Sequence, residues 1–302
     1  MPSRVRYERL ATERVNPRSR SLDRLSPRAI ATLMNGEDRR AVAAVGRVAP
    51  AIGAAVERIV ASLARGGRLV FVGAGTSGRL GVLEAAECPP TFGTPRTLVQ
   101  AIMAGGRASV FRSREGAEDD ARAARRAVRA RVRRGDVLVG ISASGVTPFV
   151  RAALTAAAAR GATTILVACN ATRAPGRALL IAPAPGPEVL AGSTRLKAGT
   201  ATKLVLNTLT TASMTRLGKV YGNRMIDLQP RSAKLQARAE RLVAEIAGVG
   251  AARARRALRG ARGRVRLAIV MARGNLPAGA AARALRAAGG SLRSVLEPRP
   301  SR

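Results

Sequence analysis

Two segments of the chain combine hydroxyl side chains with glycines and could hold an anionic ligand. The first, Gly73–Gly78 (GAGTSG), follows a short apolar run and precedes an expected helix, and its candidate ligand-binding residues are Thr76, Ser77 and Gly78. Hydroxyls beside unpaired backbone N–H groups at a helix N-terminus suit a phosphate or a sugar hydroxyl. The spacing also fits the dinucleotide fingerprint, but Thr97–Met103 lacks the acidic residue expected about 20 residues further on. A tight turn without a ligand is the alternative.

The second segment has the same design. It follows the apolar run Val137–Ile141 and precedes an expected helix, and its candidate binding residues are Ser142, Ser144, Gly145 and Thr147. Thr147 before Pro148 also fits an N-cap followed by a proline at the first helical position. Open α/β sheets bind ligands at the carboxyl ends of their strands. Capping alone could explain one such loop, but two of the same design indicate a site for a phosphorylated ligand.

Glu87 is a candidate for acid–base chemistry. It shortly precedes Pro89-Pro90, which we expect to end a helix begun near Arg79, so that Glu87 would lie in the last turn. There the helix dipole and the like-charged Glu84, one turn earlier, both favour the protonated form that a general acid requires. A solvated surface glutamate is the alternative.

Glu118 and Lys197 are further candidates. Glu118 lies in EGAEDD, at the start of a helix expected over Glu115–Arg134, where acids placed for the helix dipole would explain it without catalysis. Lys197 lies in GSTRLKAGT, at the start of a long helix expected over Ser193–Leu217. An ordinary first-turn lysine is the alternative to a role in which Ser193, Thr194 and Lys197 close an anionic sugar site.

Composition limits the chemistry that is available. The 302 residues contain no histidine, which excludes Ser-His-Asp triads, Cys-His dyads and most zinc catalysis, and we expect no metal. The two cysteines, Cys88 and Cys169, and the lack of a signal peptide or a long apolar run predict a cytoplasmic chain with free thiols and no membrane segment.

The formal net charge of +35 comes from 53 Lys+Arg against 18 Asp+Glu. Nearly all of the positive charge is arginine and the aromatic fraction is 2%, so few side chains could stack on a single-stranded nucleic acid. We interpret the excess as the bias of a GC-rich coding sequence, with no specific nucleic-acid partner. A functional polyanion surface is the alternative, and either origin would attract a small anionic substrate.

The elements that must position these residues alternate along the chain. Apolar runs predict strands over residues 69–72, 98–103, 137–141, 163–169 and 179–181, with helical segments between them and a helix over 38–64. This alternation is typical of an α/β layer with a largely parallel sheet. We expect an N-terminal arm over 1–36 with short helical turns, a sheet domain over 37–235 and a small all-α domain over 236–302.

Assembled, these segments resemble the N-acetylmuramic acid 6-phosphate etherases. The resemblance covers roughly residues 12–231 and rests on TERVNP, LDRLSP, GAGTSGRLGVLEAAECPPTFG, EGAEDD, ISASGVTP, GSTRLKAGT and GKVYGNRMID. It implies a sugar isomerase (SIS) domain, in which a parallel sheet is flanked by helices, and a homodimer without metal or organic cofactor. The implied reaction cleaves the D-lactyl ether of N-acetylmuramic acid 6-phosphate with water, giving N-acetylglucosamine 6-phosphate and D-lactate during peptidoglycan recycling.

The resemblance also implies roles for individual residues. The family's acid matches Glu87, its second catalytic carboxylate matches Glu118, and its phosphate-holding hydroxyls match Ser77, Ser142, Ser144 and Thr147. An aldehyde at C1 of the open sugar would acidify the C2 proton, so a base could remove it, lactate could leave from C3 with help from an acid, and water could add. We assign Glu87 the acid and Glu118 the base.

Two other classes of function remain as alternatives. A non-catalytic sugar-phosphate-binding regulatory protein of the same fold would be expected to lack one of the two glutamates. A nucleic-acid-binding regulator would need a helix-turn-helix unit, and we find no convincing one ahead of the SIS region.

Overall fold

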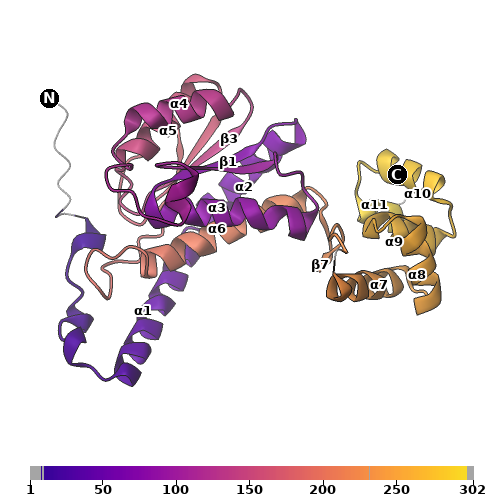
Figure 1. Ribbon diagram of the computed structural model, residues 1–302, viewed down its shortest axis with the longest axis horizontal. Coiled ribbons are helices and arrows are strands. Elements are labelled where there is room, and N and C mark those ends of the chain that lie inside the picture. The colour runs from indigo at the N-terminus through magenta and orange to yellow at the C-terminus, as the bar shows by residue number, and fades with distance from the viewer. Residues whose placement is uncertain (1–7, 9, 231, 298–302) are drawn as a thin grey trace. The chain divides into compact units, whose positions relative to one another are not determined.

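The computed structural model describes residue 8, residues 10–230 and residues 232–297. Within these residues the chain divides into two compact units, one formed by residues up to 86 together with 96–211, the other by residues 87–95 together with 212 onward. The elements are labelled in Figure 1. In the part of the chain that the structure describes, no helix has the length and apolar character needed to cross a bilayer.

The first unit is built on a five-stranded parallel sheet of order β2-β1-β3-β4-β5. Its strands are β1 (Leu69–Gly73), β2 (Val99–Met103), β3 (Val137–Ile141), β4 (Thr163–Val167) and β5 (Leu179–Ile181). Both central strands, β1 and β3, are buried along their whole length. Continuous apolar runs are what a parallel sheet covered on both faces requires, and they are why the strands could be predicted.

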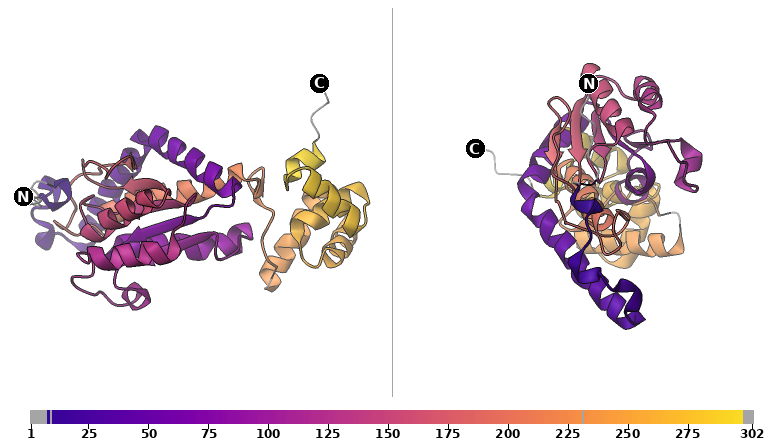
Figure 2. Two further views of the ribbon diagram at one scale, coloured as in Figure 1. Left: turned by 90° about the horizontal axis from the view of Figure 1, so that it is seen from above. Right: turned by 90° about the vertical axis from the view of Figure 1, so that its left-hand side faces the viewer.

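Helices cover both faces of this sheet, as Figures 1 and 2 show. On one face, α4 (Ala121–Arg131) and α5 (Pro148–Ala159) pack on alternate residues of the strands, such as Val70 and Leu138. On the other lie α2 (Ala49–Ala64), α3 (Gly75–Phe92) and α6 (Lys197–Arg216). A Cβ at Gly81 of α3 would lie 2.8 Å from Cβ of Phe71, so this helix packs directly on β1. The predicted parallel sheet flanked by helices is confirmed.

The second unit contains the two-stranded antiparallel sheet of β6 (Val220–Tyr221) and β7 (Arg224–Met225), followed only by helices. These helices are α7 (Ala233–Ala247), α8 (Ala251–Gly260), α9 (Val265–Gly274), α10 (Ala278–Ala287) and α11 (Leu292–Leu296). Their apolar stripes meet in one core around Val243, Leu258 and Ile269. The helical spacing of the C-terminal sequence therefore predicted its structure correctly.

Residues 10–36 of the expected N-terminal arm contain more helix than the sequence suggested. The expected short turns are present as 3₁₀ segments at Ala11–Glu13, Pro17–Ser19 and Leu22–Arg24, but α1 then runs over Pro27–Arg47. Ser26 caps this helix by accepting a hydrogen bond from the Ala29 N–H at 3.3 Å. The Ser-Pro pair that we expected within an irregular arm is thus a helix start, with proline at its first position.

Other helix boundaries also differ from the prediction. The single helix expected over 38–64 is divided at Val48 into α1 and α2, since Pro50, in the first turn of α2, could not donate a hydrogen bond within a continuous helix. The helix α4 begins only at Ala121, because the Asp120 side chain accepts from the Ala123 N–H at 2.7 Å and caps it. Finally, α6 begins at Lys197 and not at Ser193.

Candidate functional site

The two hydroxyl-rich loops meet because β1 and β3 are parallel neighbours in register. Gly73 at the end of β1 is paired with Ile141 at the end of β3, so the loops that follow leave the sheet at the same edge. Between them lies a cavity of about 250 Å³. It is lined by Ala74, Gly75, Thr76, Ser77, Glu118, Asp119, Ile141, Ser142, Ala143, Ser144, Thr147, Pro148 and Thr194.

Three hydroxyls of the second loop form one cluster on the cavity wall. The Oγ of Ser142 lies 2.8 Å from Oγ1 of Thr147 and 3.2 Å from Oγ of Ser144. Ser142 Oγ also accepts the Gly145 N–H at 3.0 Å, which fixes the turn of the loop. Each hydroxyl can rotate to donate toward the cavity, so the cluster is suited to an anion that accepts several hydrogen bonds.

Thr147 stands at the N-cap of α5, as predicted, but its side chain does not cap the helix. The free N–H in the first turn instead donates to the backbone of Glu118, with Phe149 N 2.9 Å from the Glu118 carbonyl oxygen. This bond leaves the Thr147 hydroxyl to the Ser142 cluster. It also ties the Glu118 turn to the start of α5, beside the cavity.

The first loop brings a second helix N-terminus to the cavity. Because α3 begins at Gly75, the N–H groups of its first residues lack carbonyl partners within the helix and face the same region as the Thr76 and Ser77 side chains. Pro148, the first residue of α5, lines the same cavity. Two helix N-termini therefore add their partial positive charges to the hydroxyl donors, an arrangement that favours a phosphate.

The glycines of the first loop are explained by packing. A Cβ on Gly78 would lie 2.6 Å from the Gly73 carbonyl oxygen and 2.3 Å from Sδ of Met103, so only glycine lets the helix approach the strand this closely. Gly75, in contrast, has open space but a φ of +52°, which favours glycine by conformation. The fingerprint-like spacing thus holds the N-terminus of α3 against β1 and does not by itself indicate a dinucleotide.

Glu118 is an exposed residue that lines the cavity, together with Asp119, a carboxylate that the sequence analysis did not single out. The expectation that Glu118 lies in the first turn of a helix is wrong, because Asp120 takes the cap position and places Glu118 in the preceding turn. Glu118 therefore lines the cavity from a turn and not from a helix.

Glu87 does not lie in the last turn of its helix, as was expected. The helix α3 continues through Pro89 and Pro90 to Phe92, and Gly93 N closes its last turn on the Pro89 carbonyl oxygen at 3.0 Å. Glu84, the expected like-charged neighbour, is buried and forms an ion pair with Lys203.

Glu84 also accepts a hydrogen bond from Oγ1 of Thr210 at 2.6 Å, so its charge is satisfied within its own surroundings. Glu87 itself is exposed and is not among the described residues that line the hydroxyl cavity. Nothing short-range in the sequence identified Lys203 as the partner of Glu84, since 119 positions separate them.

Of the three residues expected to close the site from the start of α6, only Thr194 lines the cavity among the residues described. Lys197 is 2% exposed and its Nζ forms an ion pair with Glu37 of α1. The structure therefore corrects the expectation that the Lys197 side chain closes the cavity. Its backbone N–H, together with that of Ala198, donates to the buried Glu188 carboxylate at 3.0 and 2.8 Å, which caps α6.

A parallel sheet whose adjacent strands end in hydroxyl-bearing loops at helix N-termini is consistent with a sugar isomerase (SIS) type of domain. Consistent with this class, residues 51–158 match the model of the glucokinase regulatory protein N-terminal SIS domain. The chain is similar to N-acetylmuramic acid 6-phosphate etherases from Synechocystis sp. (47% identity, covering 99% of this chain and 100% of the relative) and Geobacillus thermodenitrificans (51%, covering 87% and 90%). It belongs to the N-acetylmuramic acid 6-phosphate etherase family.

Solved structures resemble part of the chain. Phosphoheptose isomerase from Neisseria gonorrhoeae superposes with a TM-score of 0.46 at 20% identity, covering 62% of this chain and 98% of its own.

The packing of the first loop leads to a stability prediction. Gly78→Ala should lower the free energy of unfolding by about 1–3 kcal/mol, because the added methyl would collide with the Gly73 backbone. Urea unfolding monitored by circular dichroism measures this. Gly53→Ala, in α2 with nothing within 4 Å of the added Cβ, is the matched control and should raise the stability by about 0.5–1 kcal/mol. Equal stabilities of the Gly78 variant and the wild type would contradict the packing account.

Proposed function

We propose that this chain is an N-acetylmuramic acid 6-phosphate etherase, a lyase that cleaves the D-lactyl ether of its substrate with water. The observation that carries the proposal is the cavity in which three linked hydroxyls and two helix N-termini converge beside Glu118. The relatives bearing this name match 87–99% of the chain, so the similarity that supports this activity extends over nearly the whole sequence.

The cavity supports a phosphate as the group that anchors the substrate. Donors come from the Ser77, Ser142, Ser144 and Thr147 hydroxyls and from the first N–H groups of α3. A phosphate accepts several charge-assisted hydrogen bonds at once, which an uncharged sugar hydroxyl at the same place could not match. The 6-phosphate would therefore supply much of the binding energy and orient the sugar ring.

The reaction needs a base and an acid but no imidazole. After ring opening the C1 aldehyde acidifies the C2 proton, a carboxylate removes it, and the C3–O bond breaks with protonation of the departing lactate. Water then adds at C3 of the unsaturated aldehyde, and C2 regains a proton, giving N-acetylglucosamine 6-phosphate. General acid–base assistance at each step contributes about 10²–10⁴-fold to the rate.

We assign the base to Glu118, because its turn lines the cavity that would hold the phosphate and is tied to α5 through the Phe149 N–H. The acid is assigned to Glu87 on the family resemblance. Asp119, next to Glu118, is a further carboxylate-bearing residue that lines the cavity.

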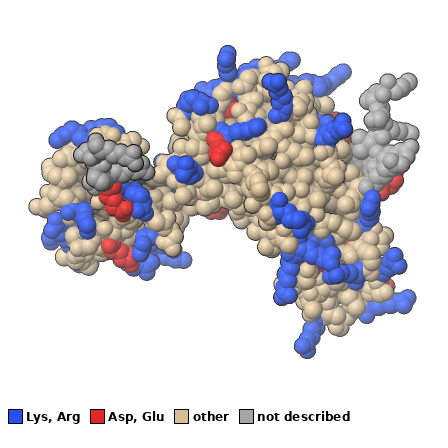
Figure 3. Space-filling view, turned by 180° about the vertical axis from the view of Figure 1, so that it is seen from behind, with Lys and Arg blue, Asp and Glu red and all other residues tan. Residues whose placement is uncertain are grey.

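The regulatory reading of the same fold is not favoured, since the full-length relatives are named as etherases. The family resemblance also supports a homodimer that acts in the cytoplasm. Basic side chains are scattered over the visible face in Figure 3 with few acidic ones among them, and such a surface attracts an anionic substrate from a distance. No specific nucleic-acid partner is needed to explain it.

The phosphate assignment leads to a kinetic prediction. Ser144→Ala removes one donor from the hydroxyl cluster and should weaken substrate binding by roughly 1–3 kcal/mol, the range for a lost charge-assisted hydrogen bond. Release of D-lactate, followed over a range of N-acetylmuramic acid 6-phosphate concentrations, gives the change in KM. Unphosphorylated N-acetylmuramic acid serves as the control and should be a very poor substrate for both proteins.

Equal turnover of the phosphorylated and unphosphorylated sugars would contradict the assignment of the cavity as the phosphate site. Absence of D-lactate with the wild-type protein would overturn the proposed function itself.

The two carboxylate roles can be separated by isotope exchange. In deuterated water, Glu118→Gln should lose exchange of the C2 proton, because no carbanion forms without the base. Glu87→Gln should lose lactate release but retain some C2 exchange, since proton abstraction precedes departure of the leaving group. Each variant should be slower by about 10²–10⁴-fold in lactate release.

NMR of the C2 proton measures proton abstraction, and a lactate assay measures departure of the leaving group. Exchange that survives in the Glu118 variant but vanishes in the Glu87 variant would reverse the assignment. Full activity of either variant would show that the substituted residue takes no part.

A further inference from the structure

Thr12 and Asn16 of the N-terminal arm are buried, as is Ser19, although most of their neighbours in the arm are exposed. Thr12 is 0% exposed and Asn16 5%, and both are polar. A buried polar side chain is costly unless it is hydrogen-bonded, so each must have partners in the body of the first unit. Those partners are bonded to two segments that line the hydroxyl cavity.

Thr12 is bound to Asn170, a buried residue shortly after β4. The Thr12 N–H donates to Oδ1 of Asn170 at 3.3 Å, and Nδ2 of Asn170 donates to Oγ1 of Thr12 at 3.0 Å. The same Nδ2 donates to the carbonyl oxygen of Ala143 at 2.9 Å. Ala143 lies between Ser142 and Ser144, so the amide of Asn170 connects the arm to the centre of the hydroxyl loop.

Thr12 is also hydrogen-bonded to the segment that carries Thr194. Its carbonyl oxygen accepts the Gly192 N–H at 3.1 Å, and the Gly192 carbonyl oxygen in turn accepts the Thr194 N–H at 3.0 Å. Thr194 lines the cavity. One residue of the arm is therefore hydrogen-bonded to the backbone that carries Thr194 and, through Asn170, to the backbone that carries Ser142 and Ser144.

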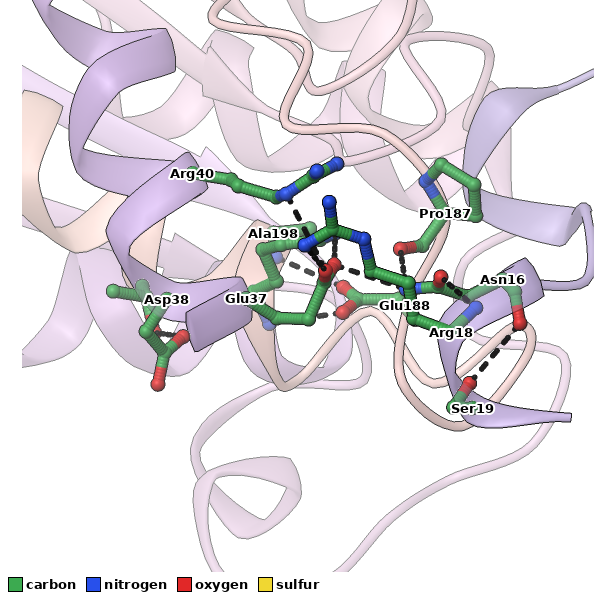
Figure 4. A network of polar contacts seen from close by, with 11 residues as sticks. Asn16, Arg18, Ser19, Glu37, Asp38, Arg40, Pro187, Glu188 and Ala198 are labelled. Carbon is green, nitrogen blue, oxygen red and sulfur yellow. Dashed lines mark hydrogen bonds and ion pairs between the residues drawn. The ribbon is translucent and has the colours of Figure 1, made fainter. Parts of the chain in front are cut away.

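Asn16 makes the second attachment, in the network drawn in Figure 4. Its Nδ2 donates to Oε2 of Glu37 at 2.9 Å and to the Pro187 carbonyl oxygen at 3.2 Å. Glu37 forms the ion pair with Lys197, the first residue of α6. Asn16 is thus connected through Glu37 to the end of the loop that carries Thr194.

The network contains two buried carboxylates, those of Glu37 and Glu188, and burial disfavours the charged form of each. Burial would raise the pKa of Glu37, but hydrogen bonds from Lys197 and Asn16 and the charges of Lys197 and Arg40 together leave that pKa below its usual value. Burial raises the pKa of the neighbouring Glu188, against the hydrogen bonds from the Ala198 and Lys197 N–H groups. A protein with apolar residues in place of a buried ion pair is often at least as stable. Directed polar bonds, in contrast, hold the segments that they join in one relative position.

We propose that Thr12–Asn16 is a positioning strap for the substrate cavity, with Thr12 as the residue that sets the spacing between the Ser142–Ser144 loop and Thr194. Thr12 touches no substrate and acts through Asn170 and Gly192. The proposal rests on the proposed function, because it takes the cavity to be the sugar-phosphate site. Small displacements of binding groups are costly: a misplacement of about 1 Å can reduce a rate by about 10²-fold.

The test is Thr12→Val, which keeps the shape of the side chain but removes the oxygen that accepts from Asn170. We expect a kcat/KM for lactate release lower by about 10–100-fold, with the larger share in KM. Titration calorimetry with N-acetylglucosamine 6-phosphate should show weaker binding by a similar factor. Thr12→Ser restores the hydroxyl and should return both quantities to near the wild-type values.

Ser62→Ala is the matched control. Ser62 is also buried and donates a single side-chain hydrogen bond, to the Gly135 carbonyl oxygen, but Gly135 precedes β3 at the end of the sheet away from the cavity. The control should lower the thermal unfolding temperature without changing KM or the calorimetric affinity. If Thr12→Val does not fold, Thr12→Ala takes its place in the same comparison, since it removes the hydroxyl with a smaller side chain.

The outcomes separate this proposal from the proposed function. Wild-type values of KM and affinity in a folded Thr12→Val variant would overturn the strap while leaving the etherase activity in place. A wild-type protein that binds N-acetylglucosamine 6-phosphate without releasing lactate would overturn the activity, and weaker binding by the variant would still support the strap. Absence of binding by the wild type would overturn both.

Discussion

The parallel pairing of β1 with β3 is the constraint on which the candidate site depends. Because Gly73 and Ile141 are level in this ladder, the two loops that follow the strands leave the sheet at one edge and share one cavity. A shift of one residue would turn the side chains of a strand to the opposite face. Burial of both strands along their length makes such a shift costly, so the core that stabilises the sheet also fixes the site.

At this edge of the sheet, backbone groups supply part of the positive charge for an anion and position the Glu118 turn. The N-termini of α3 and α5 supply partial positive charge, and the Phe149 N–H uses the Glu118 carbonyl to hold the carboxylate turn in place. The hydroxyl cluster then adds donors that can rotate. These neutral donors, together with the helix N-termini, could hold a phosphate through hydrogen bonds.

Features encoded over short stretches of sequence were predictable. The strands follow from apolar runs bounded by glycine, and both hydroxyl loops follow from serine, threonine and glycine placed between a strand and a helix. The start of α5 at Thr147-Pro148 was also correct, because proline favours the first helical position, although the Thr147 hydroxyl does not cap the helix.

Features that depend on distant partners could not be predicted. Lys197 was expected in the site, but its partner Glu37 stands 160 positions earlier in the chain. The surroundings of Glu87 were misjudged because Lys203 neutralises Glu84 and because α3 continues past Pro89 and Pro90. A proline disfavours the turn before it, yet the rest of this helix supports that turn. The burial of Thr12 depends in the same way on Asn170, 158 positions away.

The central claim is that the cavity between the two loops holds the phosphate of a sugar phosphate. A crystal structure of the protein soaked with N-acetylglucosamine 6-phosphate tests it most directly. We expect phosphate oxygens within hydrogen-bond distance of the Ser142, Ser144 and Thr147 hydroxyls, with the sugar carbons directed toward Glu118. A fully occupied ligand whose phosphate lies elsewhere, with these hydroxyls still bonded only to one another, would contradict it.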